Sequence, residues 1–187
     1  RYRVSHQIEQ LHYNNISCDR VWFEDLQIEQ LKKYQNFIFF RTPVTDTIKS
    51  FIRKAKEENK TVFYDIDDLV FANEYVDTIE HLKSMNKDEL DLYYDGVRRI
   101  GDTLKLYDYA ITTTESLANE LQKYTEDVYI SRNVASDKMV EFSEQALTEV
   151  EKREGKVIIG YLSGSITHNQ DFELIKPVII RLLESHN

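Results

Sequence analysis

The feature that most constrains the fold is an alternation between short apolar runs, rich in β-branched and aromatic residues, and longer stretches of helical periodicity. Buried parallel strands read as short continuous apolar runs, and joining two of them requires a crossover of helical length. The alternation therefore predicts an α/β fold with a Rossmann-like parallel sheet flanked by helices. We expect strands at residues 19–23, 36–40, 61–64, 109–112, 127–130 and 156–161.

The stretches between these runs place their apolar residues on one face of a helix. In residues 48–55, for example, Ile48, Phe51, Ile52 and Ala55 recur at i, i+3, i+4 and i+7, which indicates a helix packed on a core. Similar stripes predict helices around residues 4–11, 90–104 and 117–124. Thr112 and Glu115 have the spacing of a capping box at the start of the last of these.

The 187 residues are enough for one domain and the beginning of another. We assign residues 1–155 to one Rossmann-like domain, in which the charged stretch 136–155 forms a solvated helix leading into an interdomain connection. Residues 156–187 then supply the first strand–loop–helix unit of a second, truncated domain. We read the chain as a piece of a longer protein.

Charge and composition exclude several classes. A formal net charge of −9 argues against nucleic acid as a partner, because binding to phosphate backbones depends on Lys and Arg. The single cysteine, Cys18, rules out an internal disulfide and a cysteine-rich zinc site, so a reducing, cytoplasmic location is expected. The longest apolar stretches, such as residues 37–40, are far too short to span a bilayer.

Three carboxylates, Asp65, Asp67 and Asp68, follow one predicted strand directly. Ligands of open α/β sheets bind beyond the carboxyl ends of the strands, and the repulsion among these carboxylates requires a cation, backbone hydrogen bonds or a raised pKa. Three interpretations of these carboxylates remain open. Asp67 or Asp68 can cap a turn, or Asp65 and Asp67 can bind a divalent ion. The carboxylates can also form a polar wall that accepts hydrogen bonds from substrate hydroxyls.

A second candidate is the loop after the last predicted strand, which carries Ser163, Gly164, Ser165, Thr167 and His168. Glycine permits close backbone approach, and hydroxyls and helix N-terminal N–H groups bind phosphate. The loop reads either as a phosphate cradle or as a turn capped by Ser and Asn.

Polar residues also follow two other predicted strands. Arg41 ends the strand at 36–40, while Arg132 and Asn133 follow the strand at 127–130. The arginines can meet a phosphate, or simply pair with nearby acids.

Taken in order, several segments resemble bacterial glycosyltransferases of the GT-B type, which act in cell-surface polysaccharide assembly. They are Tyr2-Arg3-Val4 with Gln7, residues 64–71, Thr113-Thr114 before Leu117-Ala118, Arg132-Asn133, and the stretch from Ile159 to Phe172. The resemblance runs through almost the whole chain, and the last stretch is its most specific part.

The resemblance implies an acceptor-side domain facing a donor domain that holds a nucleotide sugar. Asp65, Asp67 and Asp68 would orient an acceptor or supply a base, and Ser163 to His168 would face the donor diphosphate. A nucleoside-diphosphate sugar is then the co-substrate, a glycan or lipid-linked molecule is the acceptor, and neither a cofactor nor an essential metal is expected. The full protein would include the remainder of its C-terminal domain and would work in the cytoplasm, with the inner membrane face as a further expected location.

Three departures from the family pattern matter. First, the donor loop has Ser, Gly, Thr and His where many relatives carry Arg and Lys. Second, the family's downstream acidic pair would lie after Asn187. Third, the first strand of the family's domain would precede Tyr2. Two alternatives to this function remain: a metal-dependent GT-A-like transferase using Asp65-x-Asp67, and a non-catalytic α/β ligand-binding or scaffold domain.

Overall fold

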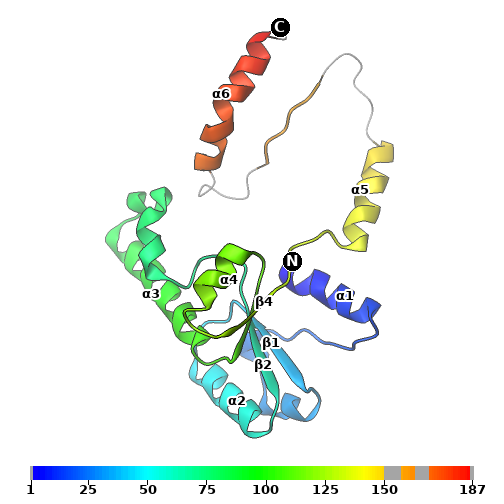
Figure 1. Ribbon diagram of the computed structural model, residues 1–187, viewed down its shortest axis with the longest axis vertical. Coiled ribbons are helices and arrows are strands. Elements are labelled where there is room, and N and C mark those ends of the chain that lie inside the picture. The colour runs from blue at the N-terminus through cyan, green and yellow to red at the C-terminus, as the bar shows by residue number, and fades with distance from the viewer. Residues whose placement is uncertain (1, 150–156, 163–168, 186–187) are drawn as a thin grey trace.

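The computed structural model describes residues 2–149, 157–162 and 169–185. Its centre is a sheet of four parallel strands in the order β1-β2-β3-β4 (Figure 1). In chain order the elements are η1 (Tyr2–His6), α1 (Gln7–Tyr13), η2 (Phe23–Asp25), η3 (Ile28–Lys32), β1 (Asn36–Phe40), α2 (Asp46–Glu57), β2 (Thr61–Asp65), η4 (Asn73–Thr78), η5 (Glu80–Ser84), α3 (Lys87–Leu104), β3 (Tyr109–Thr112), α4 (Glu115–Leu121), β4 (Asp127–Ile130), α5 (Asp137–Glu149) and α6 (Asn169–Ser185).

One face of the sheet carries the main core. The strands follow one another across the sheet in sequence order, and right-handed crossovers that all step in the same direction put their helices on the same face. The core side chains of α2, α3 and α4 accordingly pack with those of one face of the sheet. This cluster includes Phe39, Val62, Tyr64 and Ala110 from the strands, and Ile48, Phe51, Ile52, Ala55, Leu104 and Leu121 from the helices.

The opposite face is covered differently. Residues that alternate with the core positions, Ile38, Phe63, Tyr109 and Tyr129, point to this side. Ile38 is 47% exposed and Tyr129 is 52% exposed. The N-terminal segment η1–α1 lies on this side, but α1 itself has no buried residue. The sheet is therefore packed tightly on one face and lightly on the other.

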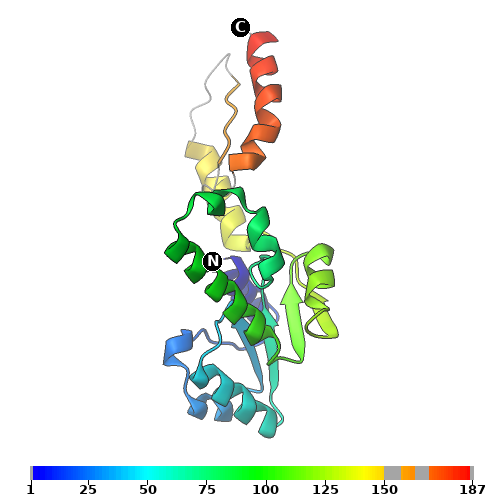
Figure 2. The ribbon, with the colours of Figure 1, turned by 90° about the vertical axis from the view of Figure 1, so that its left-hand side faces the viewer.

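Helices α5 and α6 stand away from the body that holds the sheet (Figures 1 and 2). Helix α5 has no buried residue, as expected for the charged stretch. The ring of Phe172 in α6 lies 5.1 Å from the ring of Tyr161. The described part of the chain contains no helix with both the length and the apolarity needed to cross a membrane.

Four of the six predicted strands are confirmed, at residues 36–40, 61–64, 109–112 and 127–130. The prediction of a strand at 19–23 is wrong: Phe23 begins the short helix η2, and Trp22 and Phe23 make a local ring contact at 5.2 Å. The prediction at 156–161 is also not met, because the described residues 157–161 form no strand. An apolar run forms a strand only beside a partner strand. The local sequence pattern does not show whether such a partner is present.

The predicted capping box at the start of α4 is wrong by two residues. The N-cap is Thr114, whose Oγ1 accepts a hydrogen bond from the backbone N–H of Leu117 at 3.2 Å. Thr112 is instead the last residue of β3 and is fully buried. The strand extends to Thr112 and holds it in the sheet, so the helix begins later than the Thr–Glu spacing suggests.

Candidate functional site

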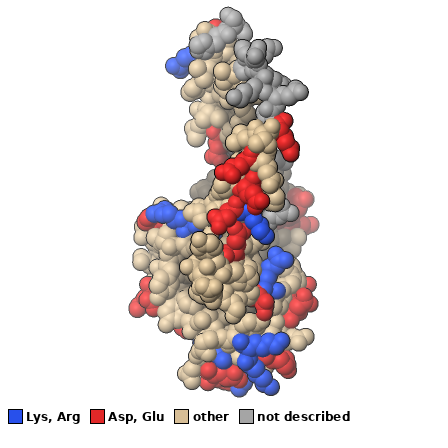
Figure 3. All heavy atoms as spheres, turned by 90° about the vertical axis from the view of Figure 1, so that its right-hand side faces the viewer, with Lys and Arg blue, Asp and Glu red and all other residues tan. Residues whose placement is uncertain are grey.

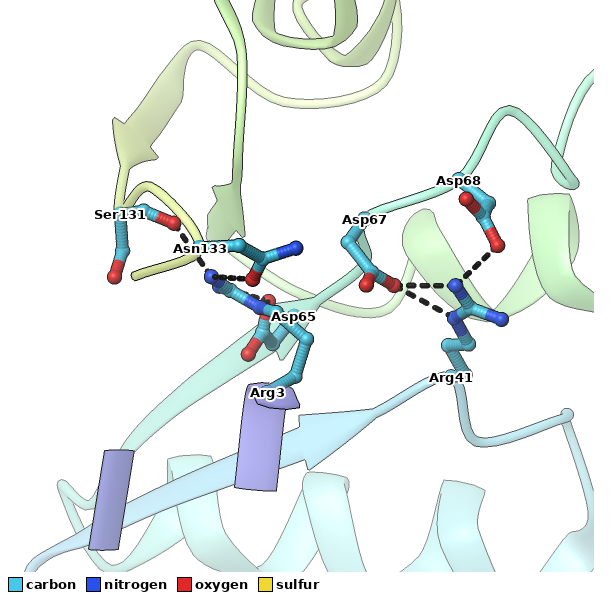
Figure 4. Close-up of polar contacts among 7 residues, drawn as sticks. All are labelled: Arg3, Arg41, Asp65, Asp67, Asp68, Ser131 and Asn133. Atoms are coloured by element: carbon cyan, nitrogen blue, oxygen red, sulfur yellow. Dashed lines mark hydrogen bonds and ion pairs between the residues drawn. The ribbon is translucent and has the colours of Figure 1, made fainter. Parts of the chain in front are cut away.

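The carboxyl ends of the parallel strands lie at one edge of the sheet and bring together most of the predicted polar residues that the structure describes. Hydrogen bonds continue the ladder past the strand ends: Arg41 N–H donates to Asp65 O at 3.1 Å, Ile66 N–H to Ile111 O at 3.0 Å, and Ser131 N–H to Thr112 O at 2.7 Å. The segments after β1, β2 and β4 are therefore held in register. Figure 4 shows how their side chains lie.

Asp65 is held by an arginine from the N-terminal segment. Arg3 donates from Nε and Nη2 to Asp65 Oδ1 at 3.1 and 2.5 Å, and from Nη1 to Ser131 O at 2.5 Å and Asn133 Oδ1 at 3.5 Å (Figure 4). Arg3 is only 3% exposed and Asp65 only 1%. The guanidinium thus ties η1 to the ends of β2 and β4 at once.

Burial dominates the ionisation of this carboxyl. Desolvation raises the pKa of Asp65 above its ordinary 3.8, and the hydrogen bonds and charge of Arg3 offset only part of that rise. Removing either partner would leave a buried charge without its counter-ion, which is costly. The pair is therefore a strong candidate for fixing the geometry of the edge, and Asp65 is poorly placed to meet a ligand from solvent.

Asp67 and Asp68 share a different arginine. Arg41 donates from Nε and Nη2 to Asp67 Oδ1 at 2.8 and 2.5 Å, and from Nη2 to Asp68 Oδ2 (Figure 4). Their side chains are 16% and 57% exposed, respectively. This cluster, unlike the Arg3–Asp65 pair, is open to solvent and combines two acceptors with one cation.

The backbone of Arg41 is unusual. Its φ is +47°, in the left-handed region that costs a non-glycine residue about 1–2 kcal/mol. Its guanidinium also lies 5.3 Å from the centre of the Phe40 ring, within the range of a cation–π contact. Strained backbone of this kind is concentrated at functional sites, so Arg41 is the residue of the edge that most invites a functional test.

Arg132 and Asn133 lie after β4 but do not join the Arg41 cluster. Arg132 Nη2 pairs with Glu115 Oε1, and both side chains are exposed. The backbone hydrogen bond at Glu115 lowers the pKa of this carboxyl, and the charge of Arg132 lowers it further. Asn133 instead contacts Arg3.

A pocket of about 440 Å³ opens between the N-terminal segment and the lightly covered face of the sheet. Its apolar residues come from both sides, and amide and cationic side chains surround them, a composition typical of small-molecule sites. It is lined by Arg3, His6, Gln7, Gln10, Leu11, Asn14, Ile16, Ile38, Ile111, Ser131, Arg132, Asn133 and Val134. Arg132 and Asn133 therefore belong to this pocket rather than to the Arg41 cluster.

The sequence thus predicted the edge but not its division into two groups. Asp65 pairs with Arg3, whereas Asp67 and Asp68 pair with Arg41. The sequence indicates Arg3 and Gln7 only through the resemblance to glycosyltransferases. They stand at positions i and i+4 of a helical segment and so share one face, a signal that could point to the pocket. The donor-loop residues Ser163, Gly164, Ser165, Thr167 and His168 lie outside the described residues.

The carboxylates lack the arrangement of a preformed metal centre. No group of three or more His, Cys, Asp or Glu side chains in residues 2–149, 157–162 and 169–185 is placed to hold an ion. What the edge offers chemically is a solvent-accessible pair of carboxylates positioned by a guanidinium, beside a partly apolar pocket with an amide-rich rim.

Comparison with known proteins gives no assignment. No model of a protein family matches this chain, and no significant match is found among curated proteins or among solved structures.

Proposed function

We propose that this chain is the acceptor-side portion of a glycosyltransferase that moves a sugar from a nucleoside-diphosphate sugar to a glycan or lipid-linked acceptor. The observation that carries the proposal is the open carboxyl edge, where Arg41 holds Asp67 and Asp68 just after the end of β2. Carboxylates in such a position can accept hydrogen bonds from sugar hydroxyls, and open α/β sheets bind ligands at this edge.

The roles of the three aspartates follow from their exposure. Asp68 is the most exposed of them, at 57% of its side chain, so we assign it and Asp67 to the acceptor hydroxyl. If the reaction inverts the anomeric carbon, one of the two accepts the proton of that hydroxyl as its oxygen bonds to the sugar and the bond to the departing diphosphate breaks. Asp65, buried against Arg3, positions the edge.

The pocket beside the N-terminal segment suits the rest of an acceptor. A sugar ring presents an apolar C–H face and a hydroxyl edge, and the pocket pairs isoleucines with amides such as Gln10 and Asn133. The diphosphate would be met by the loop from Ser163 to His168, in the second domain that residues 156–187 are expected to begin. We further propose that the full protein acts in the cytoplasm near the membrane and needs neither an essential metal nor a cofactor.

The test is transfer and binding by the full-length protein. We expect hydrolysis or transfer of a nucleoside-diphosphate sugar in the presence of a suitable acceptor, with Asp68→Asn lowering kcat by about 10²–10⁴-fold if it is the general base. Lys49→Gln, on the exposed surface of α2, is the matched control and should leave turnover unchanged.

Binding separates the alternatives. Metal-indifferent binding of nucleotide sugar supports the proposal, whereas binding that requires manganese would support a GT-A-like use of Asp65 and Asp67. Binding neither nucleoside diphosphates nor glycans would overturn both and leave a scaffold domain.

A further inference from the structure

The pocket between the N-terminal segment and the sheet has basic side chains in its lining, although the chain as a whole is acidic. Among the described residues, the titratable side chains that line it are Arg3, His6 and Arg132, with no Asp or Glu. The whole chain has 33 acidic residues against 24 Lys and Arg. The side of the molecule toward α1 shows a broad uncharged area over the body that holds the sheet (Figure 3). An anionic ligand would therefore be attracted to this pocket rather than repelled from it.

Arg132 supplies the charge that such a ligand can use. Arg3 also lines the pocket, but the buried carboxylate of Asp65 already offsets its charge. The Arg132 side chain is 61% exposed, and its partner Glu115 is 66% exposed and lies outside the pocket lining. An exposed ion pair of this kind is weak, so an anion in the pocket can replace Glu115. The planar fork of a guanidinium matches the two oxygens of a carboxylate.

The remainder of the lining suits a single sugar ring. Ile16 and Ile38 are 52% and 47% exposed and offer apolar surface to the C–H face of a ring. Asn133 accepts from Arg3 through Oδ1, so its Nδ2 points away from that guanidinium and can donate to a hydroxyl (Figure 4). The volume of about 440 Å³ lies within the range of small-molecule sites.

We propose that this pocket selects an acidic sugar, a hexuronate unit of the acceptor, and binds its carboxylate at Arg132. The inference rests on the function proposed above, which assigns the pocket to the acceptor, and it adds the class of sugar. A neutral hexose carries a CH₂OH group in place of the carboxylate and has no charge for Arg132. A phosphate monoester carries up to two charges, whereas the pocket offers one guanidinium that is not already buried against an acid.

The test is the binding of matched methyl glycosides to the full-length protein, measured by NMR titration. Methyl glucuronide and methyl galacturonide are compared with methyl glucoside and methyl galactoside, and inorganic phosphate serves as a competing anion. We expect at least one hexuronide to bind about tenfold more tightly than its neutral counterpart. This preference should shrink as the salt concentration rises from about 0.02 to 0.5 M, because salt screens exposed charges.

Two variants connect the preference to the charge of the pocket. Arg132→Gln removes the guanidinium, and Gln10→Glu adds a carboxylate to the lining at an exposed position with little change of shape. Each should abolish the preference and leave binding of the neutral glycoside nearly unchanged. Arg98→Gln is the matched control, because Arg98 is also exposed, at 58%, and paired with acids on α3. It should keep the preference.

The outcomes separate this inference from the proposed function. Equal binding of acidic and neutral glycosides, a preference that survives Arg132→Gln, or tighter binding of inorganic phosphate than of either hexuronide would each overturn the acidic subsite. Binding of no glycoside at all would overturn it too. The proposed function fails separately, when the full-length protein neither binds nor turns over a nucleoside-diphosphate sugar.

Discussion

The guanidinium of Arg3 forms an ion pair with the carboxylate of Asp65, 62 positions further along the chain. Arg3 Nη2 lies 2.5 Å from Asp65 Oδ1, and both side chains are almost completely buried. The same guanidinium reaches the segment after β4 through Ser131 O and Asn133. Because α1 buries no residue of its own, this contact is a principal attachment of the N-terminal segment to the sheet.

Removing the arginine should therefore be costly. We expect Arg3→Met to lower the free energy of unfolding by about 3–5 kcal/mol, because it leaves the buried Asp65 charge without its counter-ion. Arg3→Met combined with Asp65→Asn should regain much of that loss, as urea denaturation would show. Arg132→Met, which breaks an exposed pair, is the control and should change stability little. Equal effects of the two arginine variants would contradict a buried ion pair.

The pH dependence of stability should report the raised pKa of Asp65. The folded protein then binds this proton more tightly than the unfolded chain, so the contribution of Asp65 is fully present below pH 3.8 and is lost as the pH rises through the higher folded value. Urea denaturation from pH 3.8 to neutrality should show wild type losing stability relative to Asp65→Asn. A difference that grows in favour of wild type with rising pH would mean that Arg3 outweighs desolvation.

Arg41 allows backbone strain and ion pairing to be separated. Its φ of +47° suits glycine, so Arg41→Gly should be more stable than Arg41→Ala by about 1 kcal/mol, although both lose the contacts with Asp67 and Asp68. Thermal denaturation of both variants measures the difference. Alanine equal to or better than glycine would show that the left-handed conformation is not retained in solution.

Two glycines of α3 make a matched pair. A Cβ added at Gly101 would lie 2.6 Å from Phe71 O, whereas at Gly96 it would meet nothing within 4 Å. We expect Gly101→Ala to destabilise by about 1–3 kcal/mol through overpacking. Gly96→Ala should stabilise by about 0.5–1 kcal/mol, because alanine favours the helix. Chemical denaturation of the two variants measures both changes in the free energy of unfolding. A stabilising Gly101→Ala would contradict the close approach of α3 to the backbone of Phe71.

The start of α4 distinguishes two neighbouring threonines. Thr114→Ala should cost about 1 kcal/mol, because Thr114 is the N-cap. Thr112→Val should be close to neutral, since Thr112 Oγ1 is buried without a hydrogen-bond partner in the described part of the chain and valine keeps its shape. The reverse order of the two effects in thermal unfolding would restore the capping box predicted from Thr112 and Glu115.

The sequence alone determined the elements whose signals are local. Four strands, the stripe of Ile48, Phe51, Ile52 and Ala55, and the gathering of polar residues at strand ends follow from side-chain periodicity and from the rule that parallel strands end at the same edge. The tertiary structure decided what depends on distant partners. It paired Asp65 with Arg3 and Asp67 with Arg41, and it left residues 19–22 and 157–161 without strand partners. Periodicity says which face a residue occupies, but ion pairs and strand pairing are settled by which segments pack together, and that choice depends on contacts between residues far apart in the chain.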